Sequence, residues 1–117
     1  MTAAVTARLL ADRADVELAV AAAESQLAAL VRSQRDVAAD DEHDPEGPTV
    51  SLQRAEATAM LVQARQHLVE VDAALDRIND GRYGTCESCH REIPAARLEV
   101  RPFARRCVLC AAREERS

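Results

Sequence analysis

The sequence predicts a fold dominated by α-helices: a long antiparallel helical hairpin of the coiled-coil type, followed by a small four-cysteine zinc finger. Three observations predict it: apolar residues recur every seven positions in two segments, a short Pro- and Gly-containing stretch separates those segments, and two Cys-x-x-Cys pairs follow them. The 117 residues include no Trp, one Tyr and one Phe, and large rings carry much of the burial in compact cores. We therefore expect a hairpin domain over residues 1–81 and a finger domain over 82–117.

The first helix is predicted over about residues 3–39. Its heptad repeat consists of Leu9, Val16, Ala23, Leu30 and Val37, with Val20 and Leu27 completing a/d pairs. Sustained heptads of this kind indicate a helix that packs along a coiled-coil seam. Polar residues also fall at or beside the seam positions, where Arg stems can cover apolar surface while their charged ends reach water.

A second helix is predicted over about residues 50–80, with the same repeat. Its heptad residues are Leu61, Leu68 and Leu75, followed three positions later by Ala64, Val71 and Ile78. Thr49 or Ser51 would cap its start, and Gly81 would end it as the C′ residue. At 1.5 Å per residue each helix would be roughly 45–55 Å long. Pairing of the same seam with a second chain is the alternative to a hairpin.

The connection between these helices is short and acidic. Residues 39–51 read ADDEHDPEGPTVS, in which Pro45, Gly47 and Pro48 are expected to break any helix. A short connection favours antiparallel neighbours, so residues 40–50 would form the tip of the hairpin. Five acids lie within it: Asp40, Asp41, Glu42, Asp44 and Glu46. Such a cluster could approach a metal-containing or Arg-lined site on a partner.

The charge is unevenly distributed. Residues 1–81 hold seven Arg against fifteen Asp and Glu, giving −8, whereas residues 82–117 hold eight Arg against five Glu, giving +3. An acidic hairpin argues against general duplex DNA binding, in which neutralisation of phosphates dominates the affinity. The charged N-terminus lacks the apolar stretch of a secretory signal, and no uncharged run approaches a membrane span. We therefore expect a cytoplasmic protein without a membrane partner.

The cysteines form the pattern C-x2-C-x17-C-x2-C, from Cys86 and Cys89 to Cys107 and Cys110. This spacing is typical of a four-cysteine zinc site, in which four thiolates surround Zn²⁺ at about 2.3 Å. Because such a shell leaves no position open for water, one structural Zn²⁺ per chain is expected. Residues 86–90, CESCH, also match the pattern to which a c-type haem is attached. A haem would leave the second cysteine pair, Cys107 and Cys110, without a role. A redox-labile thiol cluster is the remaining alternative.

Residues 83–110 carry further features beside the cysteines. Tyr83-Gly84 precede the first cysteine, Ile93 follows the second, Arg97-Leu98 lie in the middle, and Pro102 precedes the last pair. With these features the stretch YGTCESCHREIPAARLEVRPFARRCVLC resembles the zinc finger of the TraR/DksA family of bacterial transcription regulators. Members of that family carry a long helical hairpin immediately before the finger, so the resemblance extends to the architecture of residues 1–80.

The resemblance implies a binding partner, RNA polymerase, whose secondary channel admits the hairpin in that family. The hairpin tip then alters promoter complexes without binding DNA itself. The family tip pattern Asp-x-x-Asp-x-Ala is matched by Asp41 and Asp44, with Glu46 in place of Ala. These three residues are the implied polymerase-contacting tip. The family's binding of ppGpp does not carry over to particular residues of this chain.

Other functions also fit parts of this sequence. Gre-type factors use an acidic tip to assist transcript cleavage, and the extra acids here keep that alternative open. A protein–protein adaptor without polymerase binding is another. Nucleic-acid binding by the basic tail would use Arg91, Arg97, Arg101, Arg105 and Arg106. No nucleophile–base set, Gly-rich phosphate loop or open metal site is visible, so no catalytic residue and no enzymatic activity are expected.

Overall fold

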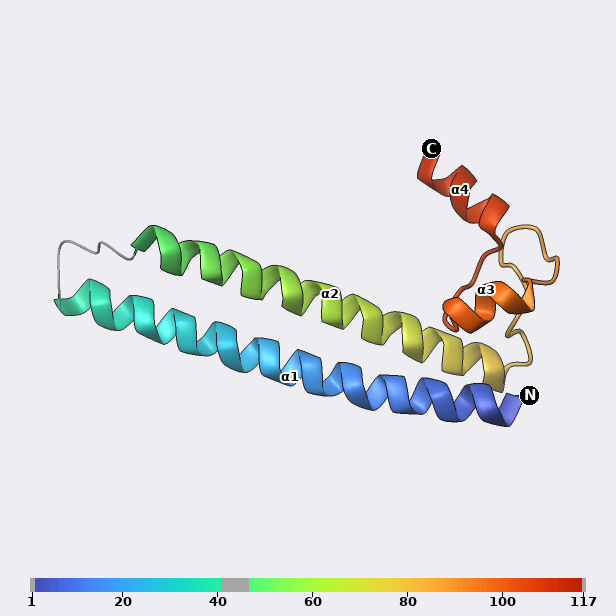
Figure 1. The fold of residues 1–117 in the computed structure, drawn as a ribbon, viewed down its shortest axis with the longest axis horizontal. Helices are drawn as coiled ribbons and strands as arrows, with labels where there is room; N and C mark the ends of the chain where they lie inside the picture. The colour runs from blue at the N-terminus through green and yellow to red at the C-terminus, as the bar shows by residue number, and fades with distance from the viewer. Residues whose placement is uncertain (1, 41–46, 117) are drawn as a thin grey trace. The chain divides into compact units, whose positions relative to one another are not determined.

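The computed structural model describes residues 2–40 and 47–116, and this part of the chain forms four helices. They are α1 (Thr2–Asp40), α2 (Gly47–Asn79), α3 (Ala95–Val100) and α4 (Val108–Arg116) (Figure 1). The chain divides into two compact units. Unit 1 combines the residues up to Arg13 with those from Val69 onward, and unit 2 comprises Ala14–Leu68. The expectation of a mainly helical protein with a long helix pair is confirmed.

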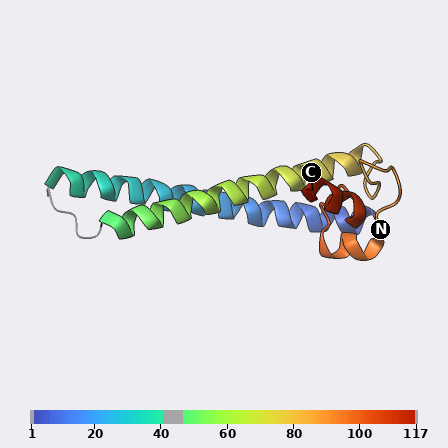
Figure 2. The same cartoon turned by 90° about the horizontal axis from the view of Figure 1, so that it is seen from above.

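Within unit 2, the segments of α1 and α2 lie side by side (Figures 1 and 2). Val16 and Ala23 of α1 and Ala57 and Leu61 of α2 are buried. Val16, Ala23 and Leu61 are heptad residues, and Ala57 lies seven positions before Ala64, so the predicted seam is the surface that the two helices bury. Among the described residues, no helix is long and apolar enough to cross a membrane.

Polar residues near the seam pair between the two helices. In unit 1, Arg13 Nε donates to Asp72 Oδ1 at 2.5 Å. In unit 2, Arg54 donates to the Gln34 side-chain oxygen at 3.0 Å. These side chains are partly or fully exposed, so each pair adds little to the free energy of unfolding. Each pair is compatible with the register of α1 against α2 that the buried seam residues set.

The start of α2 differs from the prediction. The helix begins at Gly47, so Thr49 and Ser51 lie inside it rather than capping it, and Pro48 is its second residue. Proline is tolerated in the first turn because the N–H groups there have no intrahelical acceptor, so a missing N–H loses nothing. Pro48 therefore sits at the helix start instead of breaking it.

The end of α2 is the one predicted. Gly81 adopts a left-handed conformation with φ of +73°. The Gly81 N–H donates to the Ile78 carbonyl at 3.2 Å, and the Arg82 N–H donates to the Arg77 carbonyl at 2.8 Å. This pair of hydrogen bonds is the Schellman motif, in which glycine at C′ avoids the steric penalty of positive φ. It turns the chain out of α2 into the cysteine-bearing segment.

Candidate metal centre

The first cysteine pair lies on a tight hairpin that follows α2. Thr85 and Glu92 form an isolated antiparallel bridge. Across the same hairpin, the Cys86 N–H donates to the Arg91 carbonyl at 2.8 Å and the Ile93 N–H donates to the Gly84 carbonyl at 2.7 Å. These bonds close the loop that carries Cys86 and Cys89, so both thiols face the same side of it.

Two residues of this hairpin have positive φ. Gly84 has φ of +86° and His90 has φ of +63°. At His90 the N–H donates to the Cys86 carbonyl at 3.0 Å, which closes the turn around the first cysteine pair. The His90 side chain is exposed.

The second cysteine pair lies at the start of α4. Cys107 directly precedes the helix, Cys110 lies in its first turn, and the Ala111 N–H donates to the Cys107 carbonyl at 3.0 Å. Backbone contacts join this pair to the first. The Glu87 N–H donates to the Arg105 carbonyl at 2.9 Å, and the Cys107 N–H lies 3.4 Å from Cys86 Sγ.

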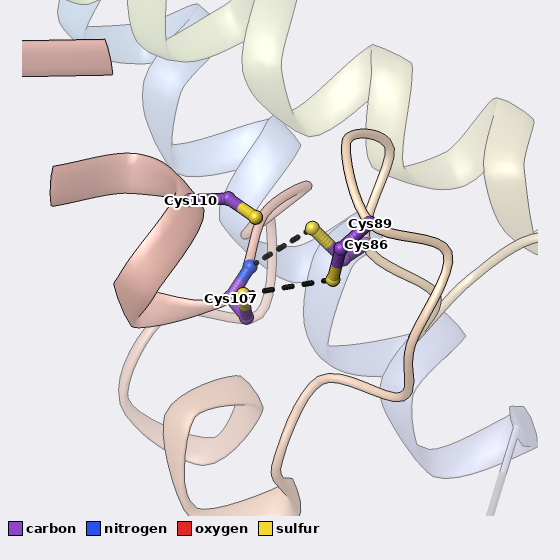
Figure 3. A group of neighbouring side chains, drawn as sticks. All are labelled: Cys86, Cys89, Cys107 and Cys110. Carbon is purple, nitrogen blue, oxygen red and sulfur yellow. Dashed lines mark hydrogen bonds between the residues drawn. The ribbon is translucent and has the colours of Figure 1, made fainter. Parts of the chain in front are cut away.

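The four sulfurs converge as a zinc site requires. All lie within 4.8 Å of one another, and Cys89 Sγ is 3.9 Å from Cys107 Sγ. Figure 3 shows the thiols of the loop and of α4 turned toward a common centre. Four ligands at 2.3 Å in a tetrahedron would place their sulfurs about 3.8 Å apart. The cluster therefore fits one Zn²⁺, and the prediction that the four cysteines gather is confirmed.

The electrostatics of the cluster favour a cation. Burial raises the pKa of the Cys86 thiol, but hydrogen bonds from the backbone of Cys89, Cys107 and Ser88 outweigh burial and lower that pKa to about 6. Interaction with the Cys107 sulfur, together with burial, raises the pKa of Cys110 to about 12. One thiol thus ionises readily, whereas another keeps its proton beside an existing negative charge. A divalent cation at the centre removes that repulsion and displaces the remaining protons.

A small apolar cluster supports the cysteines. Ile93 is only 2% exposed and packs with Cys86 and Cys110, and Leu98 of α3 covers them. Arg97 of α3 donates from Nε to the Arg106 carbonyl at 2.9 Å. This bond connects α3 to the segment that precedes Cys107. Several residues noted beside the cysteines in the sequence therefore have structural roles here.

The finger is docked on the base of the helices within unit 1. Leu9 of α1 and Val71 and Ala74 of α2 are fully buried, and Tyr83 and Phe103 of the finger pack against them. Arg77 of α2, 4% exposed, donates from its guanidinium to the Phe103 carbonyl at 3.1 Å. Burial lowers the pKa of Arg77, and the nearby charges of Glu87 and Glu70 act in the opposite direction.

Tyr83, at the start of the finger, is hydrogen-bonded to the segment that precedes the second cysteine pair. Its hydroxyl donates to the Pro102 carbonyl at 2.7 Å, across 19 residues. We expect Tyr83→Phe to lower the free energy of unfolding by about 1–2 kcal/mol, because the carbonyl of the buried Pro102 loses its donor. Urea unfolding of the zinc-loaded protein, followed by circular dichroism, measures this. Zinc content should stay at one per chain, and an unchanged midpoint would contradict a stabilising role for the bond.

The structure does not test the predicted tip residues. Asp41, Asp44 and Glu46 lie outside the described residues, so their role stays a prediction. Sequence reasoning missed Arg77, since the heptad repeat places position 77 on the solvent side of α2. The signal in the sequence was the position of Arg77 four residues before Gly81, which ends the helix. The segment after Gly81 folds back over Arg77.

The finger matches a known family. Residues 81–116 fit the profile described as the prokaryotic dksA/traR C4-type zinc finger. An uncharacterised protein of Aquifex aeolicus is 49% identical over 49 residues, which are 42% of this chain and 34% of that protein. The RNA polymerase-binding transcription factor DksA of Caulobacter vibrioides is 44% identical over 52 residues, 44% of this chain and 37% of that protein. The chain thus spans about a third of the length of these curated relatives.

A solved structure shares the fold. The transcription factor DksA2 from Pseudomonas aeruginosa superposes with a TM-score of 0.79 at 23% sequence identity, covering 98% of this chain and 83% of that one. At this identity the likeness concerns the fold: a long helix pair and a C-terminal finger in the same order. The expected architecture is therefore confirmed over nearly the whole chain.

Proposed function

This protein carries a zinc finger of the prokaryotic dksA/traR family, and from this premise we propose that it is a zinc-containing regulator that binds RNA polymerase. The hairpin of α1 and α2 would enter the secondary channel of the enzyme. Its acidic tip, with Asp41, Asp44 and Glu46, would act there on transcription initiation. The regulator would itself catalyse no reaction.

One observation carries this proposal: the four-cysteine finger is anchored on the base of a long helix pair, in a chain whose finger resembles those of factors named for polymerase binding. Tyr83, Phe103 and the buried Arg77 connect the finger to α1 and α2. The arrangement supports insertion of a helical element and offers no open metal position for catalysis.

The proposal is tested by titrating zinc-loaded protein against bacterial RNA polymerase core enzyme. We expect saturable binding that a known secondary-channel factor displaces. Binding without displacement would move the contact to another surface of the polymerase. No binding at concentrations of tens of micromolar would overturn the proposal and favour an adaptor with another partner.

The role of the tip is tested by the double variant Asp41→Ala/Asp44→Ala. We expect its effect on a responsive promoter to fall by roughly tenfold or more, the result of about 1.4 kcal/mol of lost interaction at the tip. The affinity for core enzyme should change much less, because the helices remain. A matched control is Asp15→Ala/Glu56→Ala, which removes two exposed acids from the helices of unit 2.

Transcription in vitro, with the variants compared at saturating concentration, separates these outcomes. If the control variant loses as much activity as the tip variant, the general acidity of the hairpin matters and the tip has no special role. If both variants keep full activity on every responsive promoter, the tip assignment is wrong.

A further inference from the structure

A groove between α1 and α2 in unit 2 is not explained by the finger or by the tip. It has a volume of about 450 Å³ and is largely open to solvent. Leu27, Val31 and Leu61 supply apolar lining, and the charged lining consists of Arg32, Arg35, Arg65 and Glu24. Apolar side chains beside three guanidinium groups thus lie on a hairpin segment whose net charge is negative.

The basic residues of unit 2 are gathered at this groove. Residues 14–68 contain only four Arg and no Lys: Arg32, Arg35, Arg54 and Arg65. Three of them line the groove, and the fourth, Arg54, is bonded to Gln34. Positive charge is thus concentrated in one place and contributed by both helices. Apart from Arg54, the other charged residues of unit 2 are acidic.

Among the side chains that the structure describes, the groove arginines form one ion pair with a carboxylate, and that pair is exposed. Arg65 forms an ion pair with Glu24 at 3.6 Å, and both side chains are more than half exposed. An exposed pair at this distance stabilises the fold very little, so Arg65 can exchange Glu24 for another carboxylate at small cost. Among the described side chains, no carboxylate is paired with Arg32 or Arg35.

The chemistry of the groove defines the partner that fits it. Guanidinium groups bind carboxylates through paired, charge-assisted hydrogen bonds, and the apolar lining gains from covering an apolar side chain. Arginine is enriched among the few residues that dominate the binding free energy of protein interfaces. A second copy of the chain placed groove to groove would bring arginines against arginines, which like-charge repulsion disfavours.

We propose that this groove is a docking surface for an acidic segment of RNA polymerase that presents an apolar side chain between its carboxylates. This inference rests on the proposed function and adds to it a second contact, distinct from the tip. The apolar side chain would cover Leu27, Val31 and Leu61, while the carboxylates would pair with Arg32, Arg35 and Arg65.

The first test compares two double variants of equal charge change in binding to polymerase core enzyme. Arg32→Glu/Arg35→Glu reverses the charge of the groove. Arg8→Glu/Arg82→Glu reverses two exposed arginines of unit 1. We expect the groove variant to bind roughly tenfold more weakly or worse, and the control to bind nearly as the unaltered protein does. Helix content and zinc content should be unchanged in both.

The outcomes separate the two proposals. If the unaltered protein binds and both variants weaken binding equally, the proposed role of the groove is wrong and the proposed function is unaffected. If the unaltered protein does not bind, the proposed function and the proposed role of the groove are both wrong. If the groove variant changes only the self-association of the protein, measured by sedimentation, the occupant is a second copy and the proposal is wrong.

A second test identifies the chemistry of the partner. A photo-crosslinking amino acid in place of Ala28, an exposed residue of the same groove, is irradiated in the complex, and the attached polymerase peptide is sequenced. We expect a peptide with Asp or Glu on both sides of an apolar residue. A basic or uniformly polar peptide, or no crosslink while binding is intact, would contradict the proposal.

Discussion

Removal of zinc is expected to unfold the finger while the helices of unit 2 remain folded. The finger has only a small apolar cluster of its own around Ile93 and Leu98, which cannot offset the conformational entropy of ordering about 30 residues. Binding of structural zinc supplies about 10–16 kcal/mol in comparable small domains at neutral pH. The same result is expected from Cys110→Ser, because three thiolates and a hydroxyl bind zinc much more weakly.

The measurement is a nuclear magnetic resonance spectrum recorded before and after addition of a chelator. Amide signals of residues 82–116 should collapse into the unfolded region, and signals of residues 14–35 should keep their positions. Ser88→Ala is the matched control, since Ser88 lies between the cysteines of the first pair and is exposed. A finger that keeps its signals without metal would show that packing alone folds it.

The zinc affinity should also depend on pH, with a defined sign. Zinc must displace the proton that the metal-free cluster holds at Cys110, whose pKa is raised to about 12 by the Cys107 sulfur and by burial. Lowering the pH therefore weakens zinc binding, and raising it strengthens zinc binding.

Replacement of Leu9 by Ala is expected to lower the free energy of unfolding of unit 1 by about 2–5 kcal/mol. Leu9 is fully buried against Val71 and Ala74 of α2, with Tyr83 and Phe103 packed on the same cluster. The cavity would therefore weaken helix pairing and finger docking together. Leu18→Ala on the same helix is the control, because Leu18 is 71% exposed and its loss should change stability by no more than about 0.5 kcal/mol.

Tyr83 provides a direct probe of this effect, since it is the only tyrosine and the chain has no tryptophan. Its fluorescence during urea unfolding reports on unit 1 alone. We expect the midpoint to move to lower urea for Leu9→Ala and to stay in place for Leu18→Ala. Equal midpoints would mean that the cluster around Leu9 does not hold unit 1 together.

The helices and the cysteine cluster could be predicted because local patterns determine them. Leu9, Val16 and Leu61 mark the buried seam through a repeat that any long helix must obey. The cysteine spacing predicts a common centre, since zinc coordination allows few alternatives. Gly81 likewise ends α2 through the conformational freedom of a single residue.

What could not be predicted depends on contacts between distant segments. Arg77 occupies a helix position that the heptad repeat leaves to solvent, and it is buried only because the Phe103 region folds over it. The groove is lined by Arg32 and Arg35 of α1 and by Arg65 of α2. No local sequence pattern predicts that these residues lie close together. The start of α2 differs from the prediction because Pro48, which would break a helix interior, is tolerated in the first turn.

The cluster that joins Leu9 to Phe103 also orders the events of synthesis on the ribosome. Leu9 is made before its neighbours Val71 and Ala74, which follow more than 60 residues later, and Phe103 follows later still. The first turns of α1 thus lack these partners until more than 90 further residues have been made. Unit 1 consequently completes its folding only after Phe103 has been synthesised, and the start of α1 is a segment that a chaperone can meet before then.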